Sequence, residues 1–180
     1  MRARAVRRAP PAAEARRVTA QGQDTEAREL AAGWVTELHT ARLSGGHPRE
    51  KIAKALNVKV ETVASWEYRR RIPTLINLAG FGRELGLRLV VVGRDGRVRP
   101  GRTAVKPDEP WSHREIRRLG AALRGERQAR TIAQEAVAAA TGVSKWSVVQ
   151  FESGHIHPRP AVLAAWAAAL DCHVRWKTMV

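Results

Sequence analysis

The chain has 180 residues and a formal net charge of +15 at pH 7. So large a positive charge favours a polyanionic partner, with nucleic acid first and an anionic membrane surface second. The single cysteine, Cys172, excludes an intramolecular disulfide and a zinc site built on several cysteines, and no apolar run approaches the roughly 18–20 residues of a membrane span.

The segment 1–23 predicts a disordered basic arm. Residues 1–20 carry six arginines against one glutamate, and Pro10, Pro11 and the lack of a helical or strand period deny this segment a packed fold. It has no apolar core like that of a secretory signal. Its composition fits a contact along phosphates or in a minor groove, a solvated tail, or an organellar transit peptide.

Four helices are predicted after the arm. The first begins at Asp24 or Thr25 and runs to about Leu43, where Ser44-Gly45-Gly46 ends it. The side of this helix that we expect to be buried carries Leu30, Trp34, Val35 and Leu38. The repeated apolar positions indicate a helix that packs along one face.

The second to fourth helices are short. Pro48 lies in the first turn of the second, where its missing N–H is harmless, and this helix runs to Leu56. The third spans about residues 60–70. Pro73 then breaks the chain, Thr74 caps the fourth helix, and Gly86 ends it.

Residues 87–92, LRLVVV, predict a β-strand because β-branched and other apolar residues dominate them. Asp95-Gly96 supplies a turn that folds residues 97–99 back as a hairpin. Residues 100–110 contain three prolines and predict a linker. Fully extended, the linker spans about 35–40 Å, close to one turn of B-DNA, so it permits two domains to occupy successive major grooves.

The second half of the chain predicts two short helices joined by a tight turn. Residues 134–141 are nearly all helix formers, Gly142 ends them, and Ser144 is a good N-cap for a helix that continues to residue 152. Thr131 followed by Gln134 fits a capping box for the first of the two helices. Glycine suits the turn because it adopts a positive φ without strain.

The same pattern occurs earlier in the chain, with Asn57 in the place of Gly142. We call the shift from position 57 to position 142 the repeat offset. Asparagine tolerates the left-handed conformation better than most residues do. Further type-preserving pairs at this offset are Ala53/Ala138, Val58/Val143, Val63/Val148, Trp66/Phe151, Glu67/Glu152, Pro73/Pro158, Leu78/Leu163, Phe81/Trp166 and Leu85/Leu170.

The chain is therefore predicted to be a tandem repeat of one helical domain. The two domains are expected at 24–99 and 111–180. Trp66, Phe81 and Trp166 are expected in their cores.

These residues resemble the Xre/Cro helix-turn-helix class of lambdoid phage repressors. The resemblance rests on a small residue four after a polar helix start, Gly or Asn at the turn, and Glu at the end of the next helix, and it covers residues 26–92 and 112–180. In the first copy Arg49 replaces the usual glutamine. The resemblance implies a mainly α fold of two tandem lambda-repressor-like domains, each followed by a short strand. It also implies the salt bridges Arg42–Glu67 and Arg127–Glu152.

Residues 172–179 alternate apolar and polar side chains and predict a second strand. A lone strand leaves its backbone groups unsatisfied. Our hypothesis is that strand 87–92 pairs with strand 172–179, which would make each chain a covalent pseudo-dimer.

In the second copy, the resemblance implies the DNA-facing residues Gln134, Ser144, Lys145, Trp146, Ser147 and Gln150. Gln150 suits adenine, Lys145 suits guanine, and Trp146 offers an apolar edge to thymine methyls. Gln134 would meet a phosphate at a helix N-terminus. For Trp146, packing against the neighbouring domain remains an alternative.

In the first copy, the corresponding residues are Arg49, Lys59, Val60, Glu61, Thr62, Ser65, Arg69, Arg70 and Arg71. Glu61 can accept from cytosine, Val60 can touch a thymine methyl, and Thr62 is placed for a phosphate. The arginines add charge, although residues 69–71 also fit a solvated helix end. Because the two faces differ, we expect a preference for two dissimilar half-sites.

The remaining polar residues suggest no catalytic or metal centre. His155 and His157, followed by Cys172-His173, lack zinc-ligand spacing and are expected in the loop after a recognition helix, near phosphates. No Gly-rich phosphate loop, paired carboxylate cluster or nucleophile motif stands out. Neither an enzyme nor a cofactor is predicted.

The charge and the resemblance together imply a cytoplasmic, nucleoid-associated protein that binds double-stranded DNA in a sequence-specific manner and regulates transcription. A repressor, of phage-immunity or host type, fits better than an activator. A monomeric pseudo-dimer is favoured, with a homodimer as the alternative. The alternative function is an antitoxin that neutralises a toxin partner and represses its own promoter.

Overall fold

A computed structural model describes residues 12–179, with side chains from Thr25 onward. Residues 1–11 of the predicted basic arm lie outside the described residues. The first helix, α1 (Ala12–Ser44), starts well before the expected Asp24 or Thr25. Residues 12–23 are rich in Ala, Arg, Glu and Gln, all strong helix formers, so helix propensity extends into the segment expected to be disordered.

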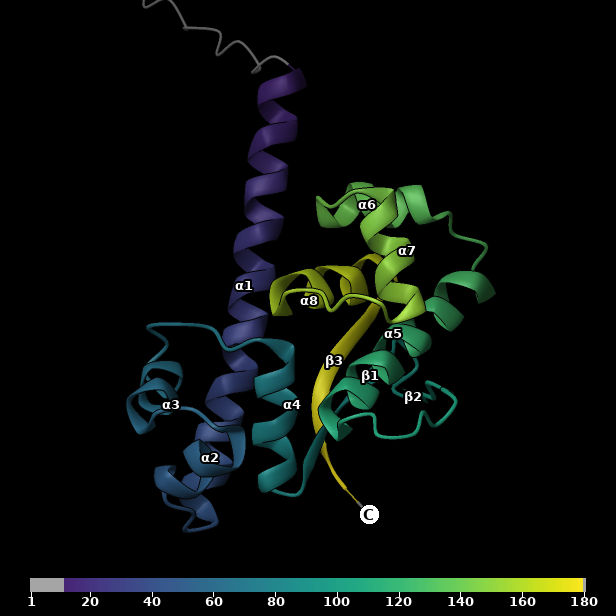
Figure 1. Cartoon of the computed structure of the whole chain (residues 1–180). Coiled ribbons are helices and arrows are strands. Elements are labelled where there is room, and N and C mark those ends of the chain that lie inside the picture. The colour runs from purple at the N-terminus through teal and green to yellow at the C-terminus, as the bar shows by residue number, and fades with distance from the viewer. Residues whose placement is uncertain (1–11, 180) are drawn as a thin grey trace, which may run out of the picture.

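The fold is mainly helical, with one small sheet (Figure 1). After α1, the first unit contains α2 (Arg49–Leu56), α3 (Val60–Glu67), α4 (Leu75–Glu84), β1 (Leu87–Gly93) and β2 (Val98–Arg99). The second unit contains α5 (Trp111–Ala129), α6 (Gln134–Thr141), α7 (Lys145–Ser153), α8 (Pro160–Ala169) and β3 (Cys172–Thr178). Arg49 and Gln134, the first residues of α2 and α6, are related by the repeat offset, as the sequence predicts.

Several local signals act as predicted. Asn57 ends α2 at φ 52° and Gly142 ends α6 at φ 68°, both in the left-handed region. The hydroxyl of Thr74 accepts a hydrogen bond from the Asn77 backbone N–H at 3.3 Å, and that of Ser144 accepts from Ser147 at 3.1 Å. These caps satisfy backbone donors that a helix start leaves without partners.

Besides the start of α1, three predicted helix boundaries are wrong. Thr131 does not cap α6: it has φ 56° within the preceding turn, and Ala133 occupies the N-cap position without a side-chain bond. Helix α3 ends at Glu67 and not near Arg70, because Arg69 turns the backbone into the left-handed region at φ 57°. Pro48 is the N-cap of α2 and lies just outside its first turn.

The core is built largely from the residues that the sequence indicates. Trp34, Val35 and Leu38 are buried, and so are Trp66, Phe81 and Trp166. Leu30 was expected there too, yet 48% of it is exposed. Helix α1 packs against α8, and its small residues Ala27 and Ala31 are buried there instead of Leu30. A contact through alanines allows two helices to approach closely, and it places the larger leucine at the rim.

The sheet confirms the predicted strand pairing. Its order is β2-β1-β3 and both pairings are antiparallel, with β1 against β3 from Leu87↔Thr178 to Gly93↔Cys172. In the middle of this register Val90 lies opposite Arg175. These two residues are themselves related by the repeat offset, so the register of the β1–β3 pair is symmetric about them and defines a local pseudo-two-fold axis of the strand pair. The short β2 forms the predicted hairpin with β1.

The two units are also interleaved through their helices. Helix α1 packs against α8, and α5 packs against α4, so the first helix of each unit lies on the fourth helix of the other (Figure 1). The indole Nε1 of Trp34 donates to the Val174 carbonyl at 2.9 Å, and that of Trp176 donates back to the Trp34 carbonyl at 3.0 Å. Residues far apart in sequence therefore share one core.

The segment 100–110 contains no helix or strand, in line with a linker, but it is held against α5. Arg117 donates to the Ala104 carbonyl at 2.8 Å and pairs with Glu109 at 2.6 Å. The relative position of the two units is consequently set by the β1–β3 pairing and by the packing of α1 on α8 and of α5 on α4. The length of the linker does not set it.

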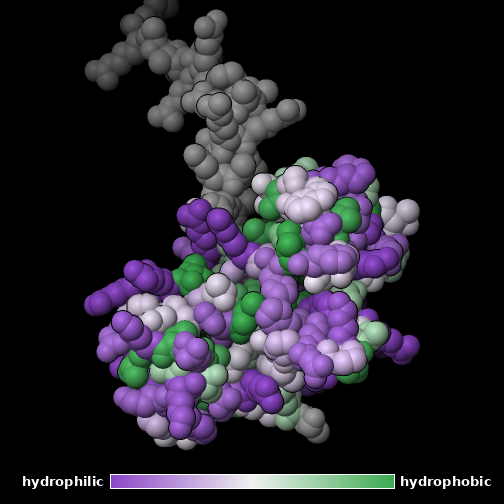
Figure 2. All heavy atoms as spheres, in the orientation of Figure 1, coloured by the Kyte–Doolittle hydropathy of each residue, from purple (hydrophilic) through white to green (hydrophobic). Residues whose placement is uncertain are grey.

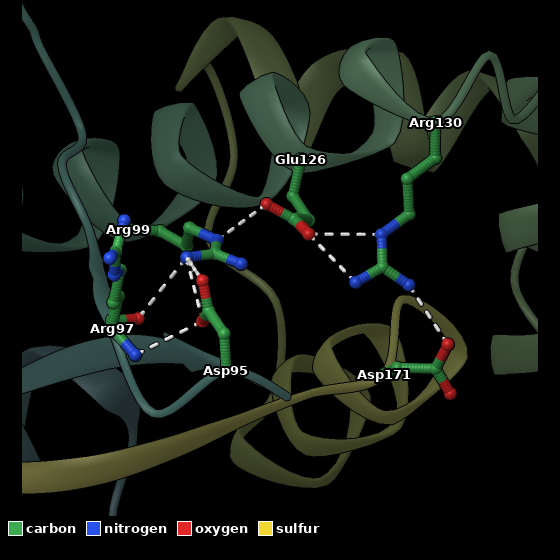
Figure 3. A network of polar contacts seen from close by, with 6 residues as sticks. All are labelled: Asp95, Arg97, Arg99, Glu126, Arg130 and Asp171. Atoms are coloured by element: carbon green, nitrogen blue, oxygen red, sulfur yellow. Dashed lines mark hydrogen bonds and ion pairs between the residues drawn. The ribbon is translucent and has the colours of Figure 1, made fainter.

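A polar network fastens the β1–β2 hairpin to the second unit (Figure 3). Glu126 of α5 accepts from Arg99 at 2.6 Å and from Arg130 at 2.8 Å, while Arg99 also pairs with Asp95 and Arg130 with Asp171. Burial favours a higher pKa for Glu126, but the hydrogen bonds from the two arginines outweigh it and lower the pKa. Because Glu126 is ionised at neutral pH, it links α5 to Arg99 of the hairpin and, through Arg130, to Asp171.

Candidate nucleic-acid interface

A buried ion pair holds α7 against α5, the helix before the α6–α7 pair. Arg127 donates to both carboxylate oxygens of Glu152, at 2.5 and 2.9 Å, and to the Ile132 carbonyl at 2.7 Å. Only 8% of Glu152 is exposed. The bridge implied by the resemblance is therefore present. It has the bidentate geometry of a strong arginine–carboxylate pair, and it fixes the end of α7.

The first unit has the same ion pair at the repeat offset. Arg42 donates to Glu67 at 2.5 and 3.1 Å and to the His47 carbonyl at 2.7 Å. His39 Nδ1 lies 3.2 Å from the same carboxylate. Burial alone would raise the pKa of Glu67, but the hydrogen bonds from Arg42, Arg49 and His39 together lower it. Each α2–α3 and α6–α7 pair is thus braced by one buried glutamate that accepts both donors of an arginine.

The first residue of α2 and of α6 completes this brace. Gln134 donates to Glu152 at 2.8 Å, and Arg49 donates to Glu67 at 2.5 Å. Arg49 also donates to the Tyr68 hydroxyl at 3.2 Å. Gln134 was expected to meet a phosphate, and Arg49 to add positive charge to the DNA-facing surface. In the structure they orient the buried glutamates, so only their remaining N–H groups are left to reach a phosphate.

The start of α7 presents its polar and aromatic side chains to solvent. Trp146 is 63% exposed, so it does not pack into the neighbouring unit. The hydroxyls of Ser144 and Ser147 lie 2.9 Å apart. Lys145 is exposed and pairs with Glu135 of α6 at 2.6 Å, which lowers the pKa of that glutamate. Gln150, on the same helix, is half-buried.

The start of α3 is less polar and carries an acidic group. Val60 is half-buried and packs against the core, whereas Glu61 and Lys59 are exposed. Thr62 is half-buried, and its carbonyl accepts from the Ser65 hydroxyl at 2.8 Å. The free surface of α3 therefore offers fewer hydrogen-bonding side chains than that of α7 does.

Sequence reasoning missed Tyr68 at the end of this helix. Tyr68 is 59% exposed, and the guanidinium carbons of Arg49 and Arg70 lie 5.2 and 5.8 Å from the centre of its ring. Arg69, Arg70 and Arg71 are all exposed. The available signal was an aromatic residue next to three arginines, a combination suited to stacking and phosphate contact.

The two histidines after α7 lie in the loop where they were expected. His155 Nδ1 is 2.6 Å from the Ser153 hydroxyl, and the ring of His157 meets that of His113 edge-on at 4.8 Å. Among the described residues no group of three or more His, Cys, Asp or Glu side chains is placed to hold a metal ion. None of the helices in the described part of the chain is long and apolar enough to span a membrane.

Comparison with known proteins gives one match. Residues 123–177 match the family model described as Helix-turn-helix, which takes in the end of α5, then α6, α7 and α8, and most of β3. Neither a curated protein nor a solved structure matches the chain significantly.

The matched family consists of DNA-binding regulator domains and is not an enzyme family. The match supports a role in DNA binding and transcription regulation, with double-stranded DNA as the partner. It covers well under half of the chain, and it includes both Ser144, which caps α7, and the Arg127–Glu152 pair.

Proposed function

We propose that the protein is a sequence-specific repressor of transcription in which one chain supplies two non-identical helix-turn-helix units. The observation that carries the proposal is the pairing of β1 with β3 about a pseudo-two-fold axis. Each unit has a left-handed turn between its two short helices and a bidentate Arg–Glu brace, related by the repeat offset. The family match covers most of the second unit, and these shared details extend the helix-turn-helix interpretation to the first.

A pseudo-two-fold axis suits the geometry of duplex DNA. Helix-turn-helix dimers read two half-sites about one helical turn, 34–36 Å, apart, with one recognition helix in each major groove. In Figure 1, α3 and α7 lie at opposite sides of the molecule, and their first residues, Val60 and Lys145, are related by the repeat offset. The β1–β3 pairing and the packing of α1 on α8 and α5 on α4 hold both helices in place. One chain therefore supplies both recognition helices that a dimer would supply.

The two proposed readers recognise different bases. In α7, Gln150 pairs with adenine and the Trp146 edge contacts a thymine methyl, while Lys145 reads guanine once it leaves Glu135. In α3, Glu61 accepts a hydrogen bond from cytosine and Val60 contacts a methyl group. An asymmetric site follows from this difference.

The flanking groups bind phosphates and set the register on the duplex. In the second unit these are the hydroxyls of Ser144 and Ser147 and the remaining N–H of Gln134; in the first unit they are Thr62, Lys59, Arg49, Arg69 and Arg70. Ser65 occupies the base-facing position that corresponds to Gln150. With a formal net charge of +15, much of the affinity is electrostatic and falls as salt rises. Occupation of two successive grooves by one chain blocks access to promoter DNA, which makes repression the expected outcome, of phage-immunity or host type.

Selection of bound sequences from a random duplex library tests the proposal, at near-physiological salt so that phosphate contacts alone do not dominate. We expect one motif with two dissimilar halves about ten base pairs apart. A palindromic motif would contradict the two-reader arrangement, and the absence of any enriched motif would contradict sequence-specific regulation.

A further inference from the structure

A cleft of about 600 Å³ lies between the two units. Its apolar walls are Ile72, Pro73, Leu75 and Ile76 from the first unit, and Pro158, Pro160 and Ala161 from the second. The two wall segments, 72–76 and 157–161, correspond at the repeat offset, so the cleft lies on the pseudo-two-fold axis. The loops that carry them cross the near side of the molecule in Figure 1, and Figure 2 shows hydrophobic atoms between hydrophilic ones at the centre of this face.

The size and lining of the cleft suit a small organic molecule. Binding pockets for such molecules have volumes of about 300–1,000 Å³, are mostly apolar, and occur preferentially where domains meet. Ile72 lies at the rim of the cleft and is 43% exposed. The residue at the corresponding position of the second unit is the polar His157. An apolar side chain at the rim of an otherwise strongly charged surface is the kind of feature that marks a binding site.

The charged side chains that line the cleft, among the residues whose side chains the structure describes, are Arg159 and Arg28. Arg159 is exposed, and none of the described residues forms an ion pair or side-chain hydrogen bond with its guanidinium. Arg159 and His157 also line a second cleft, of about 570 Å³, between the end of α6 and α8. Arg159, which has no ion-pair partner among the described residues, therefore lines both apolar clefts.

We infer that this cleft binds a small organic anion with an apolar body, such as a medium-chain carboxylate, with its charged end at Arg159. The apolar walls take the chain of the ligand, and the guanidinium takes its carboxylate in a charge-assisted hydrogen bond.

A consequence for DNA binding follows, and it rests on the proposed function. The two wall segments directly follow the loops that leave α3 and α7, since only residues 68–71 separate Glu67 from Ile72. A ligand between the loops holds them apart and changes the relative position of the two recognition helices. Because both helices must fit successive grooves at once, occupancy of the cleft weakens binding to the two-part site.

Calorimetric titration of the full chain with octanoate, in the absence of DNA, tests the site. The expected result is saturable binding of one octanoate per chain, with uncharged 1-octanol bound about tenfold more weakly because it lacks the charge-assisted bond. Arg159→Ala should weaken octanoate binding about tenfold. Arg94→Ala removes the same charge from the exposed hairpin turn and should leave binding unchanged.

A second pair of variants tests the apolar wall. Ile72→Glu places a negative charge at the rim and should abolish binding, whereas Val105→Glu, at an exposed position of the linker, should have no effect. Absence of saturable binding, or equal losses in the cleft variants and their controls, would overturn the inference.

DNA binding is measured separately, by titration of a labelled duplex with and without saturating octanoate. A drop in affinity in the intact chain that disappears in Arg159→Ala supports the regulatory consequence, and an unchanged affinity overturns it. If no duplex is bound specifically, the proposed function fails, while the calorimetry still decides on the cleft.

Discussion

The Arg127–Glu152 pair allows one prediction to be worked out in detail. Replacement of Glu152 by alanine removes the acceptor of three hydrogen bonds, two from Arg127 and one from Gln134. The arginine side chain is only 11% exposed and keeps a single bond, to the Ile132 carbonyl. The variant therefore leaves a largely buried positive charge without a counter-ion.

Loss of one partner of a buried pair costs about 3–5 kcal/mol. We expect the lower end, about 3 kcal/mol, because the partly exposed arginine can regain some hydration. For a chain of this size each kcal/mol corresponds to about 2–4 °C in melting temperature, so the melting temperature should fall by about 6–12 °C. The measurement is thermal and urea unfolding followed by circular dichroism.

Two controls separate the buried charge from other effects. Glu135→Ala breaks an exposed pair with Lys145 and should leave the melting temperature unchanged. The double variant Arg127→Met, Glu152→Leu removes both charges and should recover most of the lost stability. If Glu152→Ala melts like the parent protein, or if the double variant is worse than the single one, the ion pair does not hold α7 in place as argued.

Four further predictions follow from the same contacts. Gln150→Ala should cost about 1–3 kcal/mol on the preferred duplex and relax selectivity at one base; equal losses on random DNA, in a fluorescence titration, would reject a base-reading role. Deletion of residues 172–180 removes β3 and should destabilise both units in urea unfolding, whereas an unchanged melting curve would show that the β1–β3 pair is dispensable. The pKa of Glu67 is held below its usual value of 4.5, so its contribution to the free energy of unfolding is present above that pH and is lost as pH falls further; Glu67→Gln should flatten the pH dependence below pH 4.5, as urea unfolding across pH 2.5–7 would show. Glu135→Gln releases Lys145, which otherwise has to leave Glu135 to reach DNA, and should tighten binding to the duplex at low salt; unchanged affinity would show that the pair does not compete with DNA.

Features that depend on neighbours in sequence could be predicted from the sequence. The repeat offset located the turn residues Asn57 and Gly142 because a left-handed residue is needed wherever two short helices meet in this way. The strand pairing followed from one segment rich in β-branched residues and one that alternates apolar and polar side chains, since each would be left with unsatisfied backbone groups alone.

Features that depend on which elements meet could not be predicted. Periodicity shows which side of α1 is apolar, but not that α8 of the other unit covers it, and so Leu30 was placed in the core. The inward orientation of Arg49 and Gln134 is set by Glu67 and Glu152, which only the folded chain brings within reach.

The cleft on the pseudo-two-fold axis was invisible for the same reason. Its walls are segments from different halves of the sequence that become neighbours only after the helix exchange. Its positive rim depends on Arg159 remaining unpaired, which composition alone does not reveal.

The central claim is that one chain reads both halves of its site, and the mass of the DNA complex tests it most directly. Light scattering of the complex during size-exclusion chromatography, with a duplex that carries the selected motif, gives the number of chains per duplex. We predict one chain on each duplex, and loss of that complex when either half of the motif is scrambled. Two chains per duplex, bound to halves that each chain recognises with the same unit, would contradict the claim.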